Sequence, residues 1–360
     1  MIVAQVMRSF AGGGAQRAAI NLALGLAELG HESRLLALGD TGAFGSLVSE
    51  RVPCDALGAS GGAGALKTLP RLRRLIRERR FDVLHIHGSG VLPLVALAAA
   101  GGLGWPSLHF TWHDSGTVLG GRWWRRFAIR RALARCASVS GSSAGVAVRL
   151  QAALGGRAVR VMRNGVPDNG ALGDPAAAVP IVVWAARIVP EKQPEWFIRA
   201  AAAARAAGLP ARFVLAGAPL PRHAAYFRTV RDLASRLGEP VEFAGWIERS
   251  EDLCRGAAVG VQTSASEGLS MVLLEQMMAG LAVLATDVGD TALALAGGDA
   301  GMLLDPADES SFIAALRGVL ADPRKRADLG ARARARATGE YSCRAMGRQA
   351  EVFYRARNSE

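Results

Sequence analysis

Apolar runs of strand length alternate with segments of helical composition along nearly the whole chain, and this alternation constrains the fold more than any other feature. The first series has strand-like runs at residues 2–7, 33–38, 83–86, 107–112, 137–140 and 159–162, and helical segments at 15–29, 66–80, 123–134 and 143–154. The second has strand-like runs at 181–185, 212–216, 241–243, 259–262 and 282–286, and helical segments at 195–207, 226–237 and 271–279. Such alternation predicts an α/β fold with parallel sheets covered by helices on both faces.

A stretch without periodicity separates the two series. Residues 168–179 are rich in Gly, Pro and Ala, a composition typical of a linker. We therefore predict an N-terminal Rossmann-like domain over 1–168, a linker over 169–179 and a second Rossmann-like domain over 180–340. We expect the last helical segment, over 341–360, to pack back across the junction. Two such domains that face each other would leave a cleft between the carboxyl ends of their strands, where open α/β sheets bind ligands.

The composition fits two domains with a basic surface. The 360 residues are 50% hydrophobic, and 43 Lys plus Arg against 31 Asp plus Glu give a net charge of +12. A basic surface attracts nucleotides, nucleic acid or acidic lipid headgroups, although a GC-rich genome that favours Ala and Arg would give the same balance. The four cysteines form no CxxC pair and lack His at metal-ligand spacing, so we expect a reduced, cytoplasmic protein without a metal site.

Neither a signal peptide nor a membrane span is expected. The first strand-like run is interrupted by Arg8, and the longest apolar stretch, 91–103, is too short to cross a bilayer. The protein is therefore expected to be soluble, or peripheral on the inner face of the cell membrane.

Two carboxylates eight residues apart, Glu267 and Glu275, form the most informative local pattern. We place Glu267 in a loop after a strand and Glu275 in the following helix. Across a fully helical span they would lie roughly 12 Å apart, beyond the roughly 5 to 9.5 Å used by paired glycosidase carboxylates. They suit two ends of one long ligand, with the backbone N–H groups near Gly268, Leu269 and Ser270 as an anion site between them. An ordinary βα unit with surface glutamates fits the spacing equally well.

Two cations and a glycine loop also follow predicted strands. Arg187 and Lys192 leave the first strand of the second domain and could clamp a diphosphate; solvated loop charges are the alternative. Gly13 and Gly14 follow the first strand and open a helix, so backbone could approach a ligand there. That loop lacks the G-x-G-x-x-G spacing of a dinucleotide site, and glycines that serve only a tight turn are the alternative.

Three histidines fall at strand ends of the first domain. His85 and His87 share one face of a strand because side chains alternate with period two, and we place His87 nearer the rim. His113 follows the next strand. Buried histidines with satisfied hydrogen bonds are the alternative for each.

Taken together, these residues resemble the retaining glycosyltransferases of family 4, with the two-domain GT-B fold, over nearly the whole chain. The resemblance is to the polysaccharide- and lipopolysaccharide-assembly branch, and the matching segments occur in the family's order. They are residues 12–17, 82–87, 111–113, 163–167, Arg187 with Lys192, and the Glu-x7-Glu element of Glu267 and Glu275. Departures are Ala186 and Gln193, where glycine is usual, and Gln16, where Glu is frequent.

The resemblance implies a nucleotide-sugar donor held mainly by the second domain. Arg187 and Lys192 would bind the diphosphate, Glu275 the ribose and Glu267 the sugar hydroxyls. The backbone of Gly268 and Leu269 would add phosphate contacts, and Ile247 would contact the base.

In the first domain, the resemblance implies that Gly13 and Gly14 face the donor phosphate or the acceptor. His113 would lie at the reacting centre and Asn164 near the interdomain crossover. The catalytic set is then His113, Glu267, Arg187 and Lys192.

Charge development suggests the mechanism. Negative charge grows on the leaving phosphate, and Arg187, Lys192 and helix N–H groups would stabilise it. The chain lacks a DxD-like carboxylate motif, so we expect no metal and no cofactor beyond the nucleotide-sugar co-substrate, with UDP slightly favoured. The resemblance implies retention by same-face attack, with the leaving phosphate as base.

Residues 121–131 interleave aromatic side chains with arginines. On a helical wheel Trp123, Trp124 and Phe127 fall on one side, and Ile129, Ala132 and Leu133 fall on the other. The outer side suits an anionic bilayer or a lipid-linked acceptor, unless the tryptophans pack under a neighbouring loop. Trp123, Trp124 and His87 are the acceptor-side candidates.

The leading hypothesis is a glycosyltransferase that builds a cell-surface polysaccharide or lipid-linked glycan, with no nucleic-acid partner. One alternative is a soluble transferase acting on a small metabolite or aglycone. Another, of a different class, is a non-catalytic protein that binds a nucleotide or nucleic acid.

Overall fold

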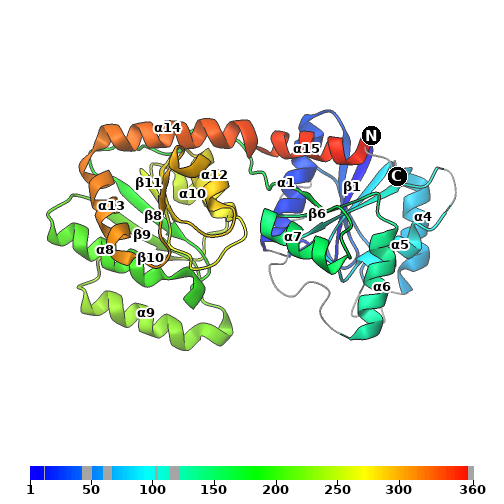
Figure 1. Cartoon of the computed structure of the whole chain (residues 1–360), viewed down its shortest axis with the longest axis horizontal. Coiled ribbons are helices and arrows are strands. Elements are labelled where there is room, and N and C mark those ends of the chain that lie inside the picture. Colours follow the sequence, from blue (N-terminus) through cyan, green and yellow to red (C-terminus); the bar gives the residue numbers. More distant parts are fainter. Residues whose placement is uncertain (12, 43–50, 60–66, 102–103, 114–121, 356–360) are drawn as a thin grey trace. The chain divides into compact units, whose positions relative to one another are not determined.

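The computed structural model describes residues 1–11, 13–42, 51–59, 67–101, 104–113 and 122–355, and these form two compact units (Figure 1). Unit 1 comprises Met1–Gly165 with Ser342–Glu360, and unit 2 comprises Val166–Tyr341. Each unit has its own parallel sheet and its own apolar cores. The predicted α/β class with two Rossmann-like domains is confirmed.

Unit 1 is built on a parallel sheet in the order β3-β2-β1-β4-β5-β6-β7. Its strands are β1 (Ile2–Met7), β2 (Glu32–Ala37), β3 (Cys54–Ala56), β4 (Val83–His87), β5 (Ser107–Trp112), β6 (Ser138–Gly141) and β7 (Arg160–Val161). Its helices are α1 (Gly14–Glu28), α4 (Leu69–Arg79), α5 (Leu92–Ala98), α6 (Trp123–Ala134), α7 (Ala144–Ala153) and α15 (Cys343–Arg355).

Successive strand residues of unit 1 point to opposite faces of this sheet. Ala4 and Leu84 share a core with α4, α5, α6 and α7, whereas Val3 and Val83 share a core with α1 and α15. The C-terminal helix α15 thus lies beside α1, at the red and blue ends of the colour scale (Figure 1). Gln5, His85 and His87 have the same parity as Val3 and Val83, so their side chains point to the α1 and α15 face.

Unit 2 has a parallel sheet in the order β10-β9-β8-β11-β12-β13. Its strands are β8 (Ile181–Ala185), β9 (Arg212–Ala216), β10 (Glu242–Gly245), β11 (Val259–Gln262), β12 (Ala282–Thr286) and β13 (Met302–Leu304). Its α-helices are α8 (Pro194–Ala206), α9 (Ala224–Arg236), α10 (Ser250–Cys254), α11 (Met271–Met278), α12 (Thr291–Ala294), α13 (Glu309–Ala321) and α14 (Pro323–Glu340). The 3-10 helices are η1 (Pro190–Lys192), η2 (Pro221–His223) and η3 (Ala296–Gly298).

The segment predicted as a linker, 169–179, is instead part of unit 2. The N–H groups of Leu172 and Gly173 bond the carbonyl oxygen of Ala279, and Asp174 N bonds that of Ala257. The unit boundaries fall at Gly165 and Tyr341 rather than at 168 and 340. A stretch rich in Gly, Pro and Ala lacks periodicity when it is a free linker and also when it runs over a core with its backbone bonded, so composition could not separate the two.

Candidate functional site

The carboxyl ends of β8 and β11 bring together several residues predicted to hold a donor. β8 leads past Arg187 to η1, and β11 leads into the loop that carries Glu267. The Thr263 hydroxyl accepts a hydrogen bond from Trp184 Nε1 at 2.9 Å and donates one to the carbonyl oxygen of Lys192 at 2.8 Å. The backbone of Lys192 is therefore fixed against the end of β11.

Lys192 and Glu267 form an ion pair in this structure. Lys192 Nζ contacts Glu267 Oε1, and the two side chains are 11% and 18% exposed. The Ser264 hydroxyl donates a second hydrogen bond to the same oxygen at 3.3 Å. Bulk salt screens a partly buried pair only weakly, so a ligand that engages one of these groups also changes the electrostatic environment of the other. The sequence predicted both residues as donor contacts but did not predict that they pair.

The start of α11 completes this end of unit 2. Ser270 caps the helix, and its hydroxyl accepts a hydrogen bond from Leu273 N at 3.3 Å. Asp290 N donates to the Gly268 carbonyl oxygen at 2.7 Å. The chain at Gly289 passes so close that a Cβ there would lie 2.2 Å from that oxygen. These contacts hold the Glu267 loop next to a helix N-terminus, where N–H groups and the helix dipole favour anions.

The other donor-side candidates of unit 2 lie on neighbouring segments. Arg187 is exposed, Glu275 is half-buried within α11, and the predicted placement of Glu267 in a loop and Glu275 in a helix is confirmed. Ile247 follows β10 and packs, half-buried, against the core beneath α10. Leu269 is half-buried beside the core of α11.

The glycine loop of unit 1 leads directly into α1. Gly13 has a φ of 128° and precedes the helix, and a Cβ at Gly13 would lie 2.7 Å from Gln16 Oε1. At Gly14 the space around an added Cβ is open. The neighbouring Gly12 lies outside the described residues. Asn164 is buried beside Gly165, where the chain passes close to Ser342 of the same unit.

The strand-end histidines of unit 1 form a buried stack. The ring centroids of His85 and His87 are 4.4 Å apart, and those of His87 and His113 are 5.1 Å apart. Burial, aided by the neighbouring imidazoles, holds the pKa values of His85 and His87 well below the usual range, and burial lowers the pKa of His113 to about 4. All three rings are therefore neutral at pH 7.

Polar residues that the sequence did not single out as site residues complete this cluster. Gln5 Oε1 lies 2.8 Å from His87 Nε2, and His85 lies 2.7 Å from both Thr111 Oγ1 and the Tyr354 hydroxyl. Gln5 had a usable signal, because an amide inside an apolar strand must find partners. Tyr354 had none, since it reaches His85 from a helix 269 residues further along the chain.

Comparison with known proteins identifies the type of molecule. The HepE protein of Anabaena, solved with UDP, matches with a TM-score of 0.78 at 20% identity over 98% of this chain and 99% of that chain. WaaG, a glycosyltransferase involved in lipopolysaccharide biosynthesis, matches with a TM-score of 0.67 at 16% identity, covering 98% and 99%. These likenesses establish the fold, which is GT-B. The Glycosyltransferase Family 4 model matches residues 12–169, and the Glycosyl transferases group 1 model matches residues 179–322. The two models together cover most of the chain, which is therefore similar to the glycosyltransferases of the family 4 type in both units.

Curated relatives match only part of the chain. D-inositol 3-phosphate glycosyltransferase of Rhodococcus erythropolis is 30% identical over 159 residues, which are 42% of this chain and 36% of that protein. Its namesake in Streptomyces avermitilis is 33% identical over 206 residues, which are 55% of this chain and 40% of that protein. The chain thus spans less than half the length of these relatives.

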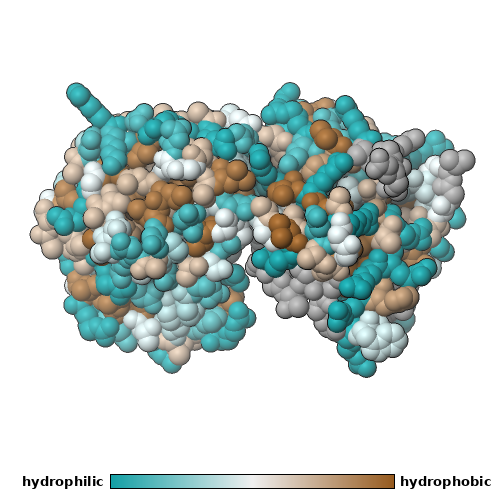
Figure 2. All heavy atoms as spheres, in the orientation of Figure 1, coloured by the Kyte–Doolittle hydropathy of each residue, from teal (hydrophilic) through white to brown (hydrophobic). Residues whose placement is uncertain are grey.

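Helix α6 of unit 1 presents aromatic side chains to solvent. Trp123, Trp124 and Phe127 are 79%, 51% and 58% exposed. Ile129, Ala132 and Leu133 are buried on the opposite side, as the helical wheel predicted. Exposed arginines interleave with the aromatic residues: Arg122, Arg126, Arg130 and Arg131. In Figure 2 hydrophilic atoms gather over this helix, at the lower edge of unit 1.

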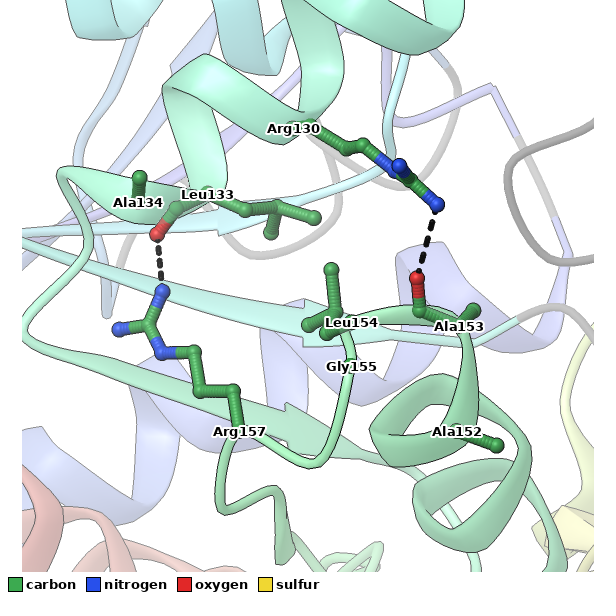
Figure 3. A pocket seen from close by; sticks show the side chains of 8 residues that line it. All are labelled: Arg130, Leu133, Ala134, Ala152, Ala153, Leu154, Gly155 and Arg157. Carbon is green, nitrogen blue, oxygen red and sulfur yellow. Dashed lines mark hydrogen bonds between the residues drawn. The ribbon is translucent and has the colours of Figure 1, made fainter.

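A hollow of about 390 Å³ lies between the C-terminal ends of α6 and α7 of unit 1 (Figure 3). Arg130 Nη2 donates to the carbonyl oxygen of Ala153 at 3.2 Å, and Arg157 Nη1 donates to that of Leu133 at 2.5 Å. Each arginine therefore caps the last turn of a helix. None of the predicted site residues lines this hollow, but Arg130 lies one turn after Phe127 on α6.

No described helix combines the length and the apolar composition that a bilayer span requires. Likewise, no three His, Cys, Asp or Glu side chains among the described residues form a group suited to a metal ion.

Proposed function

We propose that this glycosyltransferase transfers a sugar from a nucleoside diphosphate sugar, with UDP as the favoured nucleotide, and retains the anomeric configuration. The Lys192–Glu267 pair at the strand ends of unit 2 carries the proposal. Cations and helix N–H groups bind a diphosphate, and a carboxylate accepts hydrogen bonds from sugar hydroxyls. The HepE protein of Anabaena has been solved with UDP and with UDP-glucose, which supports uridine as the base.

The pair also suggests how donor binding prepares the site. When a diphosphate binds, its oxygens replace Glu267 as the neighbours of Lys192 Nζ, and the released carboxylate becomes available to the sugar hydroxyls. As the bond from the anomeric carbon to the diphosphate breaks, charge grows on the leaving phosphate, and Arg187, Lys192 and the N–H groups of Gly268 and Leu269 stabilise it. The leaving phosphate takes the proton of the acceptor hydroxyl on the same face of the sugar. This route uses no metal and no covalent enzyme intermediate, so EDTA should leave the rate unchanged.

The remaining candidates are assigned by their positions. In unit 2, Glu275 would bind the ribose hydroxyls and Ile247 would contact the base. In unit 1, His113 would supply a hydrogen-bonding group at the reacting centre. Gly13, Gly14 and Asn164 would contribute close backbone or amide contacts, and the α6 tryptophans are the acceptor-side candidates. His87 is buried with both ring nitrogens engaged by Gln5 and His113, so it would act on a substrate only through His113.

Nucleotide release tests the donor site. Glu267→Gln should lower kcat by about 100-fold, because it removes the charged acceptor for sugar hydroxyls while keeping the side-chain shape. The control is Glu309→Gln, which disrupts the Arg199–Glu309 ion pair of the same unit without touching the proposed site. Equal loss in both variants, or full activity in Glu267→Gln, would refute the assignment. Wild-type protein that turns over no nucleotide sugar would favour a non-catalytic binding role.

The acceptor that we favour is a cell-surface polysaccharide or lipid-linked glycan. A small polar metabolite is the second candidate, because the curated relatives act, by their names, on D-inositol 3-phosphate. Assaying nucleotide release with a soluble inositol phosphate and with a detergent-solubilised lipid-linked glycan separates the two. Release with the first acceptor alone would overturn our preference.

We also propose that unit 1 rests on an anionic membrane at the cytoplasmic face through α6. Exposed tryptophans favour the bilayer interface, and the interleaved arginines attract anionic headgroups. On α4, the neighbour of α5, further arginines are exposed: Arg71, Arg74, Arg77 and Arg79.

Liposome co-sedimentation tests this surface. Wild-type protein should pellet with vesicles that contain phosphatidylglycerol and release at 0.5 M NaCl, because a Debye length of about 4 Å at that salt screens the attraction. The triple change Trp123→Ser, Trp124→Ser and Phe127→Ser should abolish binding. Val148→Ser, which changes an exposed apolar residue of α7, should not. Wild-type protein that stays in the supernatant would refute membrane docking without affecting the donor site.

A further inference from the structure

Two hydrogen-bonded chains run through the buried polar cluster of unit 1. One joins Gln5, His87 and His113, and the other joins Tyr354, His85, Thr111 and Ser140. A neutral imidazole has one N–H donor and one acceptor nitrogen. The direction of each chain therefore decides which nitrogen of each ring carries the proton.

A backbone carbonyl sets the direction of the second chain. Ser140 Oγ lies 3.2 Å from the carbonyl oxygen of Phe110, which can only accept. With its proton committed there, Ser140 accepts from the Thr111 hydroxyl at 2.7 Å, and Thr111 accepts from His85 Nε2–H at 2.7 Å. His85 Nδ1 is then the acceptor for the Tyr354 hydroxyl, also at 2.7 Å. Burial raises the pKa of Tyr354, which keeps this hydroxyl protonated as a donor.

Gln5 sets the direction of the first chain. Its Oε1 faces His87 Nε2 at 2.8 Å, so it accepts the proton of that nitrogen. The other polar atom of this amide, Gln5 Nε2, is buried and makes no hydrogen bond with the residues that the structure describes. His87 Nδ1 must then accept from His113 Nε2–H, across 2.8 Å.

We propose that Gln5 is a positioning residue that fixes, through His87, the tautomer of His113, so that His113 Nδ1 is kept as an acceptor for a substrate hydroxyl. The assignment of His113 to the reaction rests on the proposed function. The tautomer does not, because it follows from contacts within unit 1. Gln5 is fully buried in β1, an interior strand of the sheet. Its role in orienting His87 would explain why this position holds a polar side chain.

Nitrogen NMR of protein labelled with 15N-histidine tests the tautomer directly. In the wild type, His85, His87 and His113 should all show a protonated Nε2 and an unprotonated Nδ1 at pH 7.5. Gln5→Leu removes the acceptor and should move His87 and His113 to a mixture of tautomers. Gln5→Glu keeps an acceptor oxygen and should restore them. Thr111→Val breaks only the second chain and should leave His113 unchanged.

Kinetics supply the functional readout. Gln5→Leu should lower kcat by about tenfold or more, with a small effect on the KM for the donor. Gln5→Glu should recover most of the rate and move the acid limb of the pH–rate profile upward. Its carboxylate favours protonation of His87 and His113. The neighbouring imidazoles of His85 and His109 oppose that protonation, and the Tyr354 hydroxyl is bonded to His85 in the same cluster.

The outcomes separate the two levels of the proposal. A protonated Nδ1 on wild-type His113, or an unchanged His113 in Gln5→Leu, overturns the role of Gln5. The expected tautomers together with full activity in Gln5→Leu would instead remove His113 from the reaction, and with it that part of the proposed function.

Discussion

At the residue scale, Glu267 is held by contacts from three separate segments. Lys192 comes from the loop before α8, Ser264 follows β11, and Gly289 follows β12. The loop that carries Glu267 is therefore positioned before any ligand arrives, which reduces the ordering that binding requires. Gly289 is not proposed to contact the ligand, but its close backbone approach can control the position of the Glu267 loop.

We expect Gly289→Ala to damage the donor site. The added Cβ would lie 2.2 and 2.3 Å from the carbonyl oxygens of Gly268 and Glu267, at a φ of 58°. Overpacking and the left-handed backbone together should cost about 2–4 kcal/mol of unfolding free energy and weaken UDP binding by about tenfold or more. Urea unfolding and calorimetric titration with UDP measure the two effects.

Gly297→Ala is the matched control, because Gly297 has a φ of 67° but open space around an added Cβ. It should cost only about 1 kcal/mol and leave UDP affinity unchanged. If the two variants behave alike, the close approach at Gly289 does not position the Glu267 loop.

Individual charges of this site could be selected from the sequence, but their pairing could not. Arg187, Lys192 and Glu267 follow predicted strands, and strand ends on one edge of a parallel sheet are neighbours. That Lys192 meets Glu267, 75 residues away, depends on rotamers and on the contact of Thr263 with the Lys192 carbonyl. No local period encodes such a contact.

At the scale of elements, one buried arginine joins three segments of unit 2. Arg326 on α14 is 1% exposed, and its guanidinium donates to the carbonyl oxygens of Pro175, Ala177, Val319 and Leu320. It therefore caps the end of α13 and fastens the segment that the sequence presented as a linker. Burial lowers the pKa of this guanidinium, and the carbonyl oxygens compensate for the lost water.

We expect Arg326→Met to lower the free energy of unfolding by about 3–4 kcal/mol, since it leaves buried carbonyl oxygens without donors. Arg326→Lys should recover less than half, because an ammonium group cannot reproduce the planar fork. Arg324→Met, at an exposed position of the same helix, should change stability by less than about 0.5 kcal/mol. Urea unfolding measures all three. Limited proteolysis should cut within 168–179 in Arg326→Met alone. If Arg326→Met resists cleavage there as well as the wild type does, Arg326 does not anchor this segment.

Two glycines allow α15 to lie against α1. A Cβ at Gly25 would lie 1.8 Å from the carbonyl oxygen of Cys343, and one at Gly347 would lie 2.8 Å from that of Gly25. Gly25→Ala should therefore lower stability by about 1–3 kcal/mol, although alanine is the better helix former. Gly318→Ala, in α13 with open space around it, should raise stability by about 0.5–1 kcal/mol. If thermal unfolding shows that Gly25→Ala and Gly318→Ala change the stability in the same direction, the close contact between α1 and α15 is refuted.

Long elements were predictable from the sequence and short ones were not. The strands at 2–7, 107–112, 259–262 and 282–286 were predicted with the bounds observed, because buried parallel strands are continuous apolar runs. The sequence missed short elements, namely β3, β13, α5, α10 and α12. A segment of three to seven residues is too short to show two full helical turns or a clear alternation of apolar and polar residues. In addition, α5 carries Pro93 in its first turn. Packing decides such segments.

At the scale of the molecule, the two units differ in which titratable groups have shifted pKa values. Unit 1 holds the strand-end histidines and also His109 within β5, whose pKa is lowered by burial to about 4. Unit 2 carries Asp308, whose pKa falls to about 2 because the Ser310 and Ser311 hydroxyls bond its carboxylate at the start of α13. Since the units have separate sheets and cores, each should respond to acid in its own pH range.

We expect unit 1 to lose stability first as the pH falls. Below about pH 6.5 the unfolded chain binds protons on its histidines, while native His109 resists protonation until about pH 4. The stability that it contributes is therefore complete above pH 6.5 and is lost on the way down to pH 4, by about 3 kcal/mol for His109 alone. His85, His87 and His113 act in the same direction. The contribution of Asp308 is lost only below its unfolded value of 3.8.

Hydrogen exchange at pH 7.5 and pH 5, read by mass spectrometry and corrected for the intrinsic rate, should show protection falling in β1, β4 and β5 and unchanged in β8, β11 and β12. The matched variant is His109→Gln, which removes one titrating group and should reduce the pH 5 loss in unit 1. Equal loss in both units would mean that they unfold as one cooperative body. Loss confined to unit 2 would contradict the assignment of the buried neutral histidines.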